Sequence, residues 1–340
     1  MQGKHSTCTN PKSANTPNNP TISQWILAEQ LKCVLNYALI GWWTAYSQMT
    51  FHSHTLVVTP SALDAHATIF SGQLFRFHVD NQANIIGVQG NIVLRFTQTS
   101  DSLIAHTSSP GTRQLMSDFF TLENIDLNAL AVEWSNVPLF ATAWQNQPGI
   151  RITKQDPHEC IFAFLCASAA PISRIAQMLN NLACKHGTPL APGLFAFPTI
   201  EQLLSVTEAD LRSYGFGFRA PRIVAAARFF NTNCITPEHL AALTYDDLVR
   251  TLTKIDGCGR KIADCIALFA FGHHHAVPVD THIWKIARNH FAPQLADQSL
   301  TPRTYQLAVD AFHDRFGDYA GWAQQILFYQ QATRKPKNNP

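Results

Sequence analysis

Residues 252–263 read LTKIDGCGRKIA, and this stretch decides the fold that we expect for the chain. We interpret it as the end of one helix, a tight turn and the start of a second helix. Thr244 is a cap for the first helix, with Asp247 three residues later as its capping-box partner. Gly257 and Gly259 flank a single residue, so the turn can adopt positive φ and let another backbone approach closely.

The second predicted helix starts near Gly259 and carries an apolar stripe at helical spacing through Ala263, Ile266 and Ala270. The free N–H groups and the positive dipole end at its start favour an anion. The anion that best fits a short, neutral, glycine-edged turn is a phosphate of a nucleic acid. We therefore expect Gly257 and Gly259 to contact phosphate.

Two residues close to this turn can perform chemistry. Lys261 lies in the first turn of the second helix, where the helix N-terminus and the cations Arg260 and Lys254 disfavour another positive charge. We expect these effects to lower the pKa of Lys261 and to leave a nucleophilic amine. Asp280 follows the apolar run at 276–279 and fits both a helix N-cap and a carboxylate facing Lys261. Each residue alone is more simply structural, but the pair at this spacing favours catalysis.

Residues 257–265 (GCGRKIADC) and 276–284 (AVPVDTHIW) resemble, nearly residue for residue, two segments of the 8-oxoguanine DNA glycosylase/AP lyases. That family belongs to the helix-hairpin-helix DNA glycosylases, which are defined by the hairpin and a following Gly/Pro-rich stretch that ends in a catalytic aspartate. Monofunctional members keep the aspartate and lack the lysine. The resemblance therefore implies that Lys261 and Asp280 are the catalytic residues of a bifunctional enzyme.

Other family segments imply the residues that bind the damaged base. The stretch SGQLFR at 71–76 resembles the family's Ser-Gly-Gln-x-Phe-Arg, whose glycine carbonyl accepts the N7–H that 8-oxoguanine has and guanine lacks. The resemblance implies that the carbonyl of Gly72 takes this role. The stretch GWAQ at 321–324, with Phe328, resembles the C-terminal segment, which implies that Gln324 reads the pairing edge and Phe328 stacks on the base.

The resemblance assigns two further contacts around the damaged nucleotide. Cys265 would face the other side of the flipped base, and His282 would touch the flanking phosphate.

When the damaged nucleotide is flipped out, it leaves a gap in the duplex. Three segments resemble the family segments that surround this gap: QDPHEC at 155–160, ISRI at 172–175 and GFRA at 217–220. The resemblance implies that Arg174 and Arg219 grip the cytosine left behind, to which a bidentate arginine is chemically suited. Phe218, which replaces a tyrosine, would wedge into the gap.

One segment departs from the family pattern. Where the family has asparagines, one of which fills the vacated space and contacts the orphan cytosine, this chain has Ala169-Ala170-Pro171. An alanine side chain cannot hydrogen-bond a base, so the sequence does not predict which opposite base is preferred.

The mechanism that we expect begins with flipping of the damaged nucleotide, because its glycosidic bond is unreachable in the stack. The Lys261 amine attacks C1′ of the sugar while Asp280 stabilises the developing positive charge. A Schiff base forms, and β-elimination cuts the strand 3′ to the site. We expect no metal and no cofactor: the triple 273–275, all histidine, is better interpreted as a surface loop, since adjacent histidines do not share a helical face.

Before the hairpin the pattern is that of short strands separated by turn residues, which predicts an antiparallel sheet from the segments 54–58, 74–78, 83–88, 92–96 and 102–106. After about residue 150 the pattern is helical throughout. We therefore predict an α+β fold with a small antiparallel β domain at 49–148 and an all-α glycosylase domain at 149–332. The helix-hairpin-helix occupies 244–272 of the second domain.

The ends of the chain are less informative. Residues 1–48 are interpreted as a poorly ordered or wrongly assigned extension, because Met49 stands just before the first strand and offers an alternative start. The apolar run at 34–46 is too short for a confident membrane span. Residues 333–340 are interpreted as a solvated tail.

Composition places mild limits on function. The net charge is +2, and residues 150–340 contain 19 Lys and Arg against 15 Asp and Glu, a modest basic excess in the half with the hairpin. The eight cysteines include no Cys-x-x-Cys and no array of the kind that holds an iron–sulfur cluster in endonuclease III-type relatives. Scattered cysteines are typical of reduced, intracellular proteins.

We expect the protein to be a monomer that binds duplex DNA with a flipped damaged base and has no membrane contact. We expect it to work in the bacterial cytoplasm or nucleoid, or in a nucleus.

Two other classes of function stay open on the sequence. One is a monofunctional glycosylase of the same fold that acts on alkylated bases, against which Lys261 argues. The other is a non-catalytic helix-hairpin-helix module that only binds DNA, which would not need Lys261 and Asp280 together.

Overall fold

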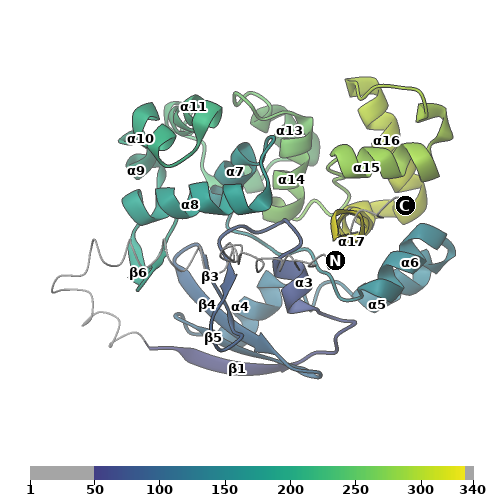
Figure 1. The fold of residues 1–340 in the computed structure, drawn as a ribbon, viewed down its shortest axis with the longest axis horizontal. Coiled ribbons are helices and arrows are strands. Elements are labelled where there is room, and N and C mark those ends of the chain that lie inside the picture. Colours follow the sequence, from purple (N-terminus) through teal and green to yellow (C-terminus); the bar gives the residue numbers. More distant parts are fainter. Residues whose placement is uncertain (1–49, 334–340) are drawn as a thin grey trace, which may run out of the picture.

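The computed structural model describes residues 50–333, and it contains a β-sheet below a larger helical part (Figure 1). The sheet is antiparallel throughout, with the order β1-β5-β4-β3-β2 and pairs such as His52 with Thr107 at its edge. Its strands are β1 (His52–Val57), β2 (His78–Val79), β3 (Ile85–Gln89), β4 (Ile92–Gln98) and β5 (Ser102–Thr107). The predicted α+β class and the antiparallel N-terminal sheet are confirmed.

The prediction of a strand at 74–78 is wrong except at its last residue. Residues 71–77 form turns and bends, and only His78–Val79 pair with β3. The reason lies in packing: Phe75 enters the core of the helical part, where it meets Phe164 at 5.6 Å between ring centroids. Phe77 enters the separate core of the sheet and stacks on Phe119 at 5.8 Å. A regular strand would place residues 75 and 77 on one face and could not serve both cores.

Four helices in the N-terminal part were not predicted from the sequence. They are α3 (Ala65–Ile69), α4 (Thr112–Phe119), α5 (Leu127–Glu133) and α6 (Pro138–Asn146). The start of α4 gives little signal, because its N-cap is Gly111 and no side chain caps it. The helices α5 and α6 bury Leu130 and Phe140 in the core of the helical part, and α6 packs beside α17 (Figure 1).

The helical part follows the sequence patterns closely. Its first helices are α7 (Pro157–Cys166), α8 (Ile172–His186), α9 (Ile200–Leu204), α10 (Glu208–Ser213), α11 (Ala220–Thr232) and α12 (Pro237–Ala241). Asp156, Thr207 and Thr236 cap α7, α10 and α12 with their side chains. Two short strands, β6 (Pro189–Ala191) and β7 (Leu194–Phe195), form a hairpin after α8 that was not predicted.

The hairpin and the C-terminal helices complete the fold. They are α13 (Tyr245–Leu252), α14 (Arg260–Phe271), α15 (Thr281–Ile286), α16 (Pro302–Phe316) and α17 (Ala320–Thr333). Between α15 and α16 lie the π-helical turn η3 (Ala287–Phe291) and the 3₁₀ turn η4 (Pro293–Leu295). Another 3₁₀ turn, η2 (Gly217–Arg219), precedes α11.

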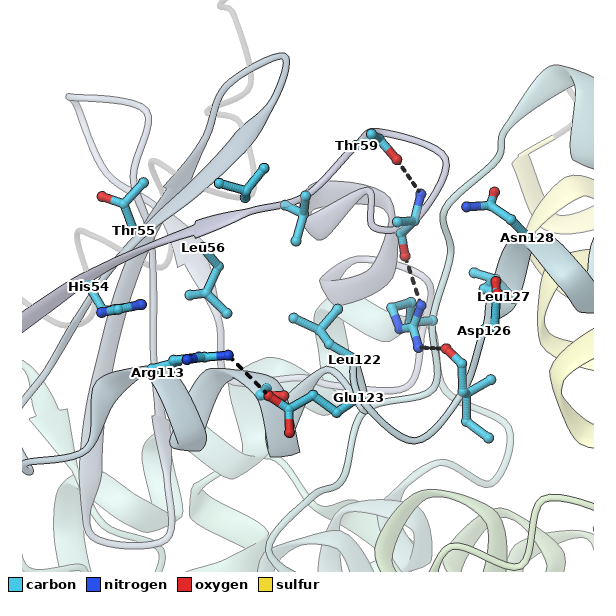
Figure 2. Close-up of a pocket in the computed structure, with 16 residues that line it drawn as sticks. His54, Thr55, Leu56, Thr59, Arg113, Leu122, Glu123, Asp126, Leu127 and Asn128 are labelled. Atoms are coloured by element: carbon cyan, nitrogen blue, oxygen red, sulfur yellow. Dashed lines mark hydrogen bonds and ion pairs between the residues drawn. The ribbon is translucent and has the colours of Figure 1, made fainter.

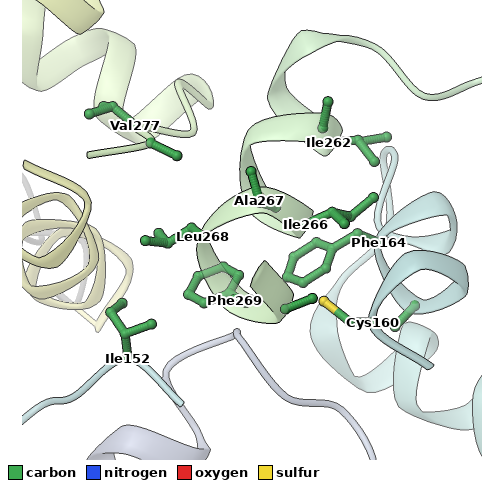
Figure 3. Close-up of a cluster of buried hydrophobic side chains, with 14 of the residues drawn as sticks. Ile152, Cys160, Phe164, Ile262, Ile266, Ala267, Leu268, Phe269 and Val277 are labelled. Atoms are coloured by element: carbon green, nitrogen blue, oxygen red, sulfur yellow. The ribbon is translucent and has the colours of Figure 1, made fainter. Parts of the chain in front are cut away.

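Helix α14 runs through the middle of the helical core. Its residues Ile262 to Ala270 are buried, and Figure 3 shows Ile266, Leu268 and Phe269 pointing into the cluster from different sides of the helix. Phe269 stacks on Phe164 of α7 at 5.4 Å and an interplanar angle of 11°. A helix that is buried on nearly all sides cannot rotate or slide without breaking this packing. The residues at its start are therefore held in fixed positions.

Several sequence interpretations lie outside the described residues. They concern the extension at 1–48, the apolar run at 34–46, the alternative start at Met49 and the tail at 334–340. Among the helices of residues 50–333, none combines the length and the apolar character that crossing a membrane requires.

Candidate active site

The hairpin joins α13 to α14 through residues 253–259. The predicted cap is present, since the Thr244 side chain accepts a hydrogen bond from the Asp247 backbone N–H at 3.3 Å. Gly257 adopts φ +80°, and a Cβ there would lie 2.5 Å from Cδ of Arg222, so glycine is required at this position. Gly259 was expected to need positive φ as well, but it has φ −76° and acts as the N-cap of α14.

The start of α14 is open. No side chain caps the helix, and nothing lies within 4 Å of where a Cβ of Gly259 would be. An uncapped N-terminus with free space in front of it is the geometry in which backbone N–H groups receive an anion. This arrangement supports the expected phosphate contact without testing it.

A buried carboxylate fixes α14 against its neighbours. Asp264, fully buried, accepts hydrogen bonds from the hydroxyl of Tyr245 on α13 at 2.7 Å and from that of Tyr305 on α16 at 2.6 Å. It also forms an ion pair with Arg260 at 3.0 Å. The Tyr305 hydroxyl in turn accepts the N–H of Val279 at 3.1 Å. This network fixes the start of α14 relative to the segment that ends in Asp280.

Asp280 caps α15, as its position in the sequence predicts. Its Oδ1 accepts the backbone N–H groups of His282 at 2.9 Å and Ile283 at 2.8 Å. These bonds hold the side chain of Asp280 at the start of α15, beside the pocket that Lys261 also lines.

A small pocket of about 50 Å³ lies between α14, α15, α17 and the loop at 71–73, which we call the Gly72 loop. Six residues singled out in the sequence line it: Gly72, Lys261, Cys265, Asp280, Gln324 and Phe328. Four others were not anticipated, namely Phe164, Phe269, Pro278 and Gln325. The two phenylalanines belong to apolar helical stripes and gave no signal. Pro278 lies within the motif at 276–284 and Gln325 adjoins Gln324, so their positions in the motifs offered one.

The Lys261 amine lies beside the thiol of Cys265 and near the carboxylate of Asp280, and all three residues line the pocket. The pKa of Lys261 is raised, mainly by Cys265, and Asp280 adds to the effect of Cys265, while burial opposes both. The expected lowering of this pKa is therefore wrong, because the local partners outweigh the helix N-terminus and the neighbouring cations. Burial raises the pKa of Cys265 to about 11, with Lys261 opposing.

The Gly72 loop is held by two of the motifs quoted above, which contact each other. Gln73 accepts the N–H and hydroxyl of Thr153, both at 2.9 Å, and donates to the carbonyl of Arg151 at 2.8 Å. Gln155 donates to the carbonyl of Gln73 at 2.7 Å. Gly72 itself adopts φ +85°, a conformation that favours glycine.

Gln324 has an unusual environment within the pocket. The side chain is buried, and its Oε1 has no hydrogen-bond partner among the described residues. An unpaired buried acceptor is costly unless a ligand satisfies it. The amide is thus available to receive a donor from a molecule that enters the pocket.

The three residues expected around the duplex gap come together outside the pocket. The guanidinium of Arg219 lies 4.2 Å from the ring centroid of Phe218, which is 54% exposed, and bonds the carbonyls of Ser168 and Ala169. Arg174 donates to the carbonyl of Gly215 at 3.0 Å. No carboxylate of residues 50–333 forms an ion pair with either arginine. An exposed aromatic ring flanked by unpaired cations is suited to contact a nucleic acid.

Ala169, at the departure from the family pattern, has φ +50°. Alanine rarely adopts this left-handed region, whereas asparagine tolerates it. Arg219 holds the position through its bond to the Ala169 carbonyl at 2.9 Å. The loop therefore keeps a backbone shape that suits asparagine although the side chain is missing.

His282 lies at the edge of the pocket. The centroid of its ring lies 5.7 Å from that of Phe328, with 83° between the two ring planes.

The histidines at 273–275, expected in a surface loop, lie in a loop but are half-buried. Trp322 donates a hydrogen bond to the ring of His274 at 2.6 Å, and the ring of His313 bonds the carbonyl of His275 at 2.7 Å. No group of three or more His, Cys, Asp or Glu side chains in residues 50–333 is arranged to hold a metal ion.

A larger open groove of about 730 Å³ lies away from these residues, between β1, α4 and the start of α5 (Figure 2). Arg113 and Glu123 face each other across it at 3.8 Å. At its inner end the buried Arg151 donates to four backbone carbonyls, those of Ala62, Phe120, Thr121 and Ile125. None of the expected site residues lines the groove.

Comparisons with known proteins agree with this geometry. Residues 55–161 match the model of the 8-oxoguanine DNA glycosylase N-terminal domain, and residues 162–306 match that of the HhH-GPD superfamily of base excision DNA repair proteins. The N-glycosylase/DNA lyase OGG1 of Arabidopsis thaliana is 32% identical over 290 residues, which are 80% of this chain and 78% of that protein.

Solved structures show the same relationship. The 8-oxoguanine glycosylase/lyase of Clostridium acetobutylicum, in complex with duplex DNA containing cytosine opposite 8-oxoG, superimposes with a TM-score of 0.73 at 26% identity, over 83% of this chain and 97% of that one. A 3-methyladenine DNA glycosylase from Archaeoglobus fulgidus gives a TM-score of 0.64 at 13% identity, over 82% of this chain and 98% of that one. The second likeness concerns the fold alone.

Proposed function

The chain belongs to the 8-oxoguanine DNA glycosylase/AP lyase family of the helix-hairpin-helix superfamily, and from this premise we propose that it excises 8-oxoguanine from duplex DNA with Lys261 as nucleophile and Asp280 as its carboxylate partner. The observation that carries the proposal is the pocket in which Lys261 and Asp280 meet the four expected base-binding residues. Excision from a duplex with one 8-oxoguanine, coupled to strand cleavage and to borohydride trapping of the enzyme, tests it.

The damaged base enters the pocket only after it is flipped out of the stack. The pocket of about 50 Å³ has room for one or two water molecules and not for a purine, so the base requires movement of a wall. Phe328 is the half-buried ring at the mouth and packs against His282. We infer that Phe328 swings out and then stacks on the base, while Gln324 receives a donor from its pairing edge and the Gly72 carbonyl accepts N7–H.

The reaction then proceeds at the sugar. A bond forms between Nζ of Lys261 and C1′ as the glycosidic bond breaks, and the base leaves with the bonding electrons. Asp280 stabilises the positive charge that develops on the sugar. Ring opening gives a Schiff base; loss of a proton from C2′ then expels the 3′ phosphate and cuts the strand. Lys261 must lose a proton before it attacks, since its raised pKa favours the ammonium form.

The partners of Lys261 give a prediction about pH. Cys265 can raise the pKa of Lys261 by its charge only as a thiolate, and burial raises the pKa of Cys265 itself to about 11. The thiol is therefore neutral near neutral pH, and we expect the rate profiles of the wild type and Cys265→Ala to coincide between about pH 6 and 9. The measurement is single-turnover cleavage of a duplex with a preformed abasic site, which lacks the base that Cys265 would contact. Profiles that are displaced from each other in this range would show that the thiol is ionised beside Lys261.

Arg219 gives a prediction about the opposite base. We expect Arg219→Ala to reduce discrimination among the four opposite bases by about 1–3 kcal/mol, because a bidentate contact to the orphan base is lost. Excision from duplexes with each opposite base measures this effect, and thermal unfolding controls for the lost bonds to Ser168 and Ala169. Unchanged ratios of the four rates would show that Arg219 only supports the loop.

The other classes considered from the sequence have less support. A monofunctional enzyme for alkylated bases shares the fold, as the likeness to the 3-methyladenine glycosylase indicates, but would leave Lys261 in the pocket without a role. A module that only binds DNA would not need a pocket with an unpaired buried amide.

The proposed partner is duplex DNA with a flipped damaged base, and related oxidised purines are included among the substrates. We propose that one copy of the chain is sufficient, because all the expected site residues come from a single chain. The protein would work wherever the cell keeps its DNA. Sedimentation of the protein with and without a duplex tests the stoichiometry, and a complex with two protein copies would contradict it.

A further inference from the structure

Gln325 follows the base-reading Gln324 on α17 and points to a different neighbour. Its side chain is buried, and its Nε2 donates to the carbonyl of Ser71 at 3.1 Å and to the hydroxyl of Ser71 at 2.9 Å. Ser71 is the first residue of the Gly72 loop. Gln325 also lines the pocket beside Gly72.

The Gly72 loop has two sets of hydrogen bonds. Bonds from Gln73 and Gln155 tie it to the segment before α7 and, through that segment, to the central part of the helical core. Among the hydrogen bonds of residues 50–333, those from Gln325 are the ones that join this loop to α17. Helix α17 carries the two other residues expected to contact the base, Gln324 and Phe328.

The position of the Gly72 loop matters because the expected discrimination of 8-oxoguanine from guanine depends on one hydrogen bond to this loop. In the proposed function, the Gly72 carbonyl accepts the N7–H by which 8-oxoguanine differs from guanine. Hydrogen bonds of this kind are short and directional, with N···O distances of about 2.7–3.2 Å, so a shift of half an ångström removes most of the benefit. Gly72 is also packed on one side, since a Cβ there would lie 3.2 Å from Cδ1 of Ile172.

We propose that Gln325 is a positioning residue that sets the distance between the Gly72 carbonyl and the base contacts on α17, and thereby the discrimination of 8-oxoguanine from guanine. This inference rests on the proposed function. Gln325 acts through Ser71 and not by its own contact with the base. Catalysis at the sugar does not depend on it, because the Asp264 network joins α14, which carries Lys261, to the segment that ends in Asp280 without involving Gln325.

The test uses Gln325→Met, which keeps the length and volume of the side chain and removes the donor. Gln331→Met, half-buried near the C-terminal end of the same helix and outside the pocket, is the matched control. In a Lys261→Gln background, affinity is measured for duplexes with 8-oxoguanine, guanine and a tetrahydrofuran abasic analogue. We expect the preference for 8-oxoguanine over guanine to fall about 5- to 30-fold, the range for loss of one well-placed hydrogen bond. Affinity for the tetrahydrofuran duplex should stay within about twofold.

A second readout separates positioning from a general defect. With Lys261 intact, cleavage of a preformed abasic site should be unchanged in Gln325→Met, while excision of 8-oxoguanine falls. Gln325→Glu, which also lacks the donor and faces the Ser71 carbonyl with a charge, should give an equal or larger loss. Ser71→Ala, which leaves Gln325 in place and removes its hydroxyl acceptor, keeps the inference testable if neither variant at position 325 folds.

A double-mutant cycle with Ser71→Ala distinguishes the route. Ser71→Ala removes the hydroxyl acceptor and keeps the carbonyl, so if Gln325 acts through Ser71 the effects of the two substitutions on discrimination add up to more than the effect of the double variant. Full additivity would overturn the inference, as would an undiminished preference in Gln325→Met. A wild-type protein with no preference for 8-oxoguanine over guanine would overturn the proposed function as well.

Discussion

Replacement of Lys261 by glutamine is expected to abolish borohydride trapping and to lower strand cleavage by at least about a thousandfold, because the only proposed nucleophile is removed. Glutamine is similar in length and uncharged, so the pocket and the Asp264 network should remain intact. Affinity for a duplex with 8-oxoguanine should change only a few-fold. The measurement is trapping and single-turnover cleavage on duplexes with 8-oxoguanine opposite each of the four bases.

Lys254→Gln is the matched control, since Lys254 is exposed in the same hairpin and does not line the pocket. That variant should be trapped as efficiently as the wild type. A covalent adduct that persists in Lys261→Gln would show that another amine attacks the sugar. Wild-type excision without any adduct would support the monofunctional alternative.

The second large effect is expected at Asp280. We expect Asp280→Asn to slow excision of 8-oxoguanine by about 100- to 1,000-fold, because the carboxylate that faces the developing sugar cation loses its charge. Asparagine is as good an N-cap as aspartate, so the bonds to His282 and Ile283 and the start of α15 should survive. Single-turnover excision and thermal unfolding measure the two properties separately.

The effect of Asp280→Asn should differ between the two reactions. Asp280 contributes to the raised pKa of Lys261, so its neutralisation lowers that pKa and frees more amine near neutral pH. Cleavage of a preformed abasic site should therefore fall less than base excision does. Asp280→Ala, which also loses the cap, is the variant in which lower stability is expected. Equal rates of excision in wild type and Asp280→Asn would remove Asp280 from the mechanism.

Sequence reasoning was most successful where local chemistry decides the structure. Thr244 and Asp280 are caps in the sequence pattern and in the structure, because capping needs only a side chain and the N–H groups that follow it. The residues of the expected lesion pocket also came together, although they lie as far apart in the chain as Gly72 and Phe328. Family motifs supplied that grouping, which spacing alone could not.

The failures have a common physical origin in tertiary contacts. The segment at 74–78 has strand composition, but Phe75 and Phe77 enter different cores and the backbone turns between them. The pKa of Lys261 depends on Cys265 and Asp280, whose distances to the amine are set by packing and not by the first turn of α14. The contact of Gln325 with Ser71 could not be predicted, because the two residues are 254 positions apart in the chain.

The division of Phe75 and Phe77 between two cores also constrains how the sequence can change over generations. A substitution that reshapes the packing of the sheet moves Phe77, and one that reshapes the helical core moves Phe75. Both movements reach Gly72 within a few residues, so neither core can drift alone without disturbing the same loop. Accepted changes in the sheet should therefore be accompanied in descendants by compensating changes around α7, even where the two sites never touch.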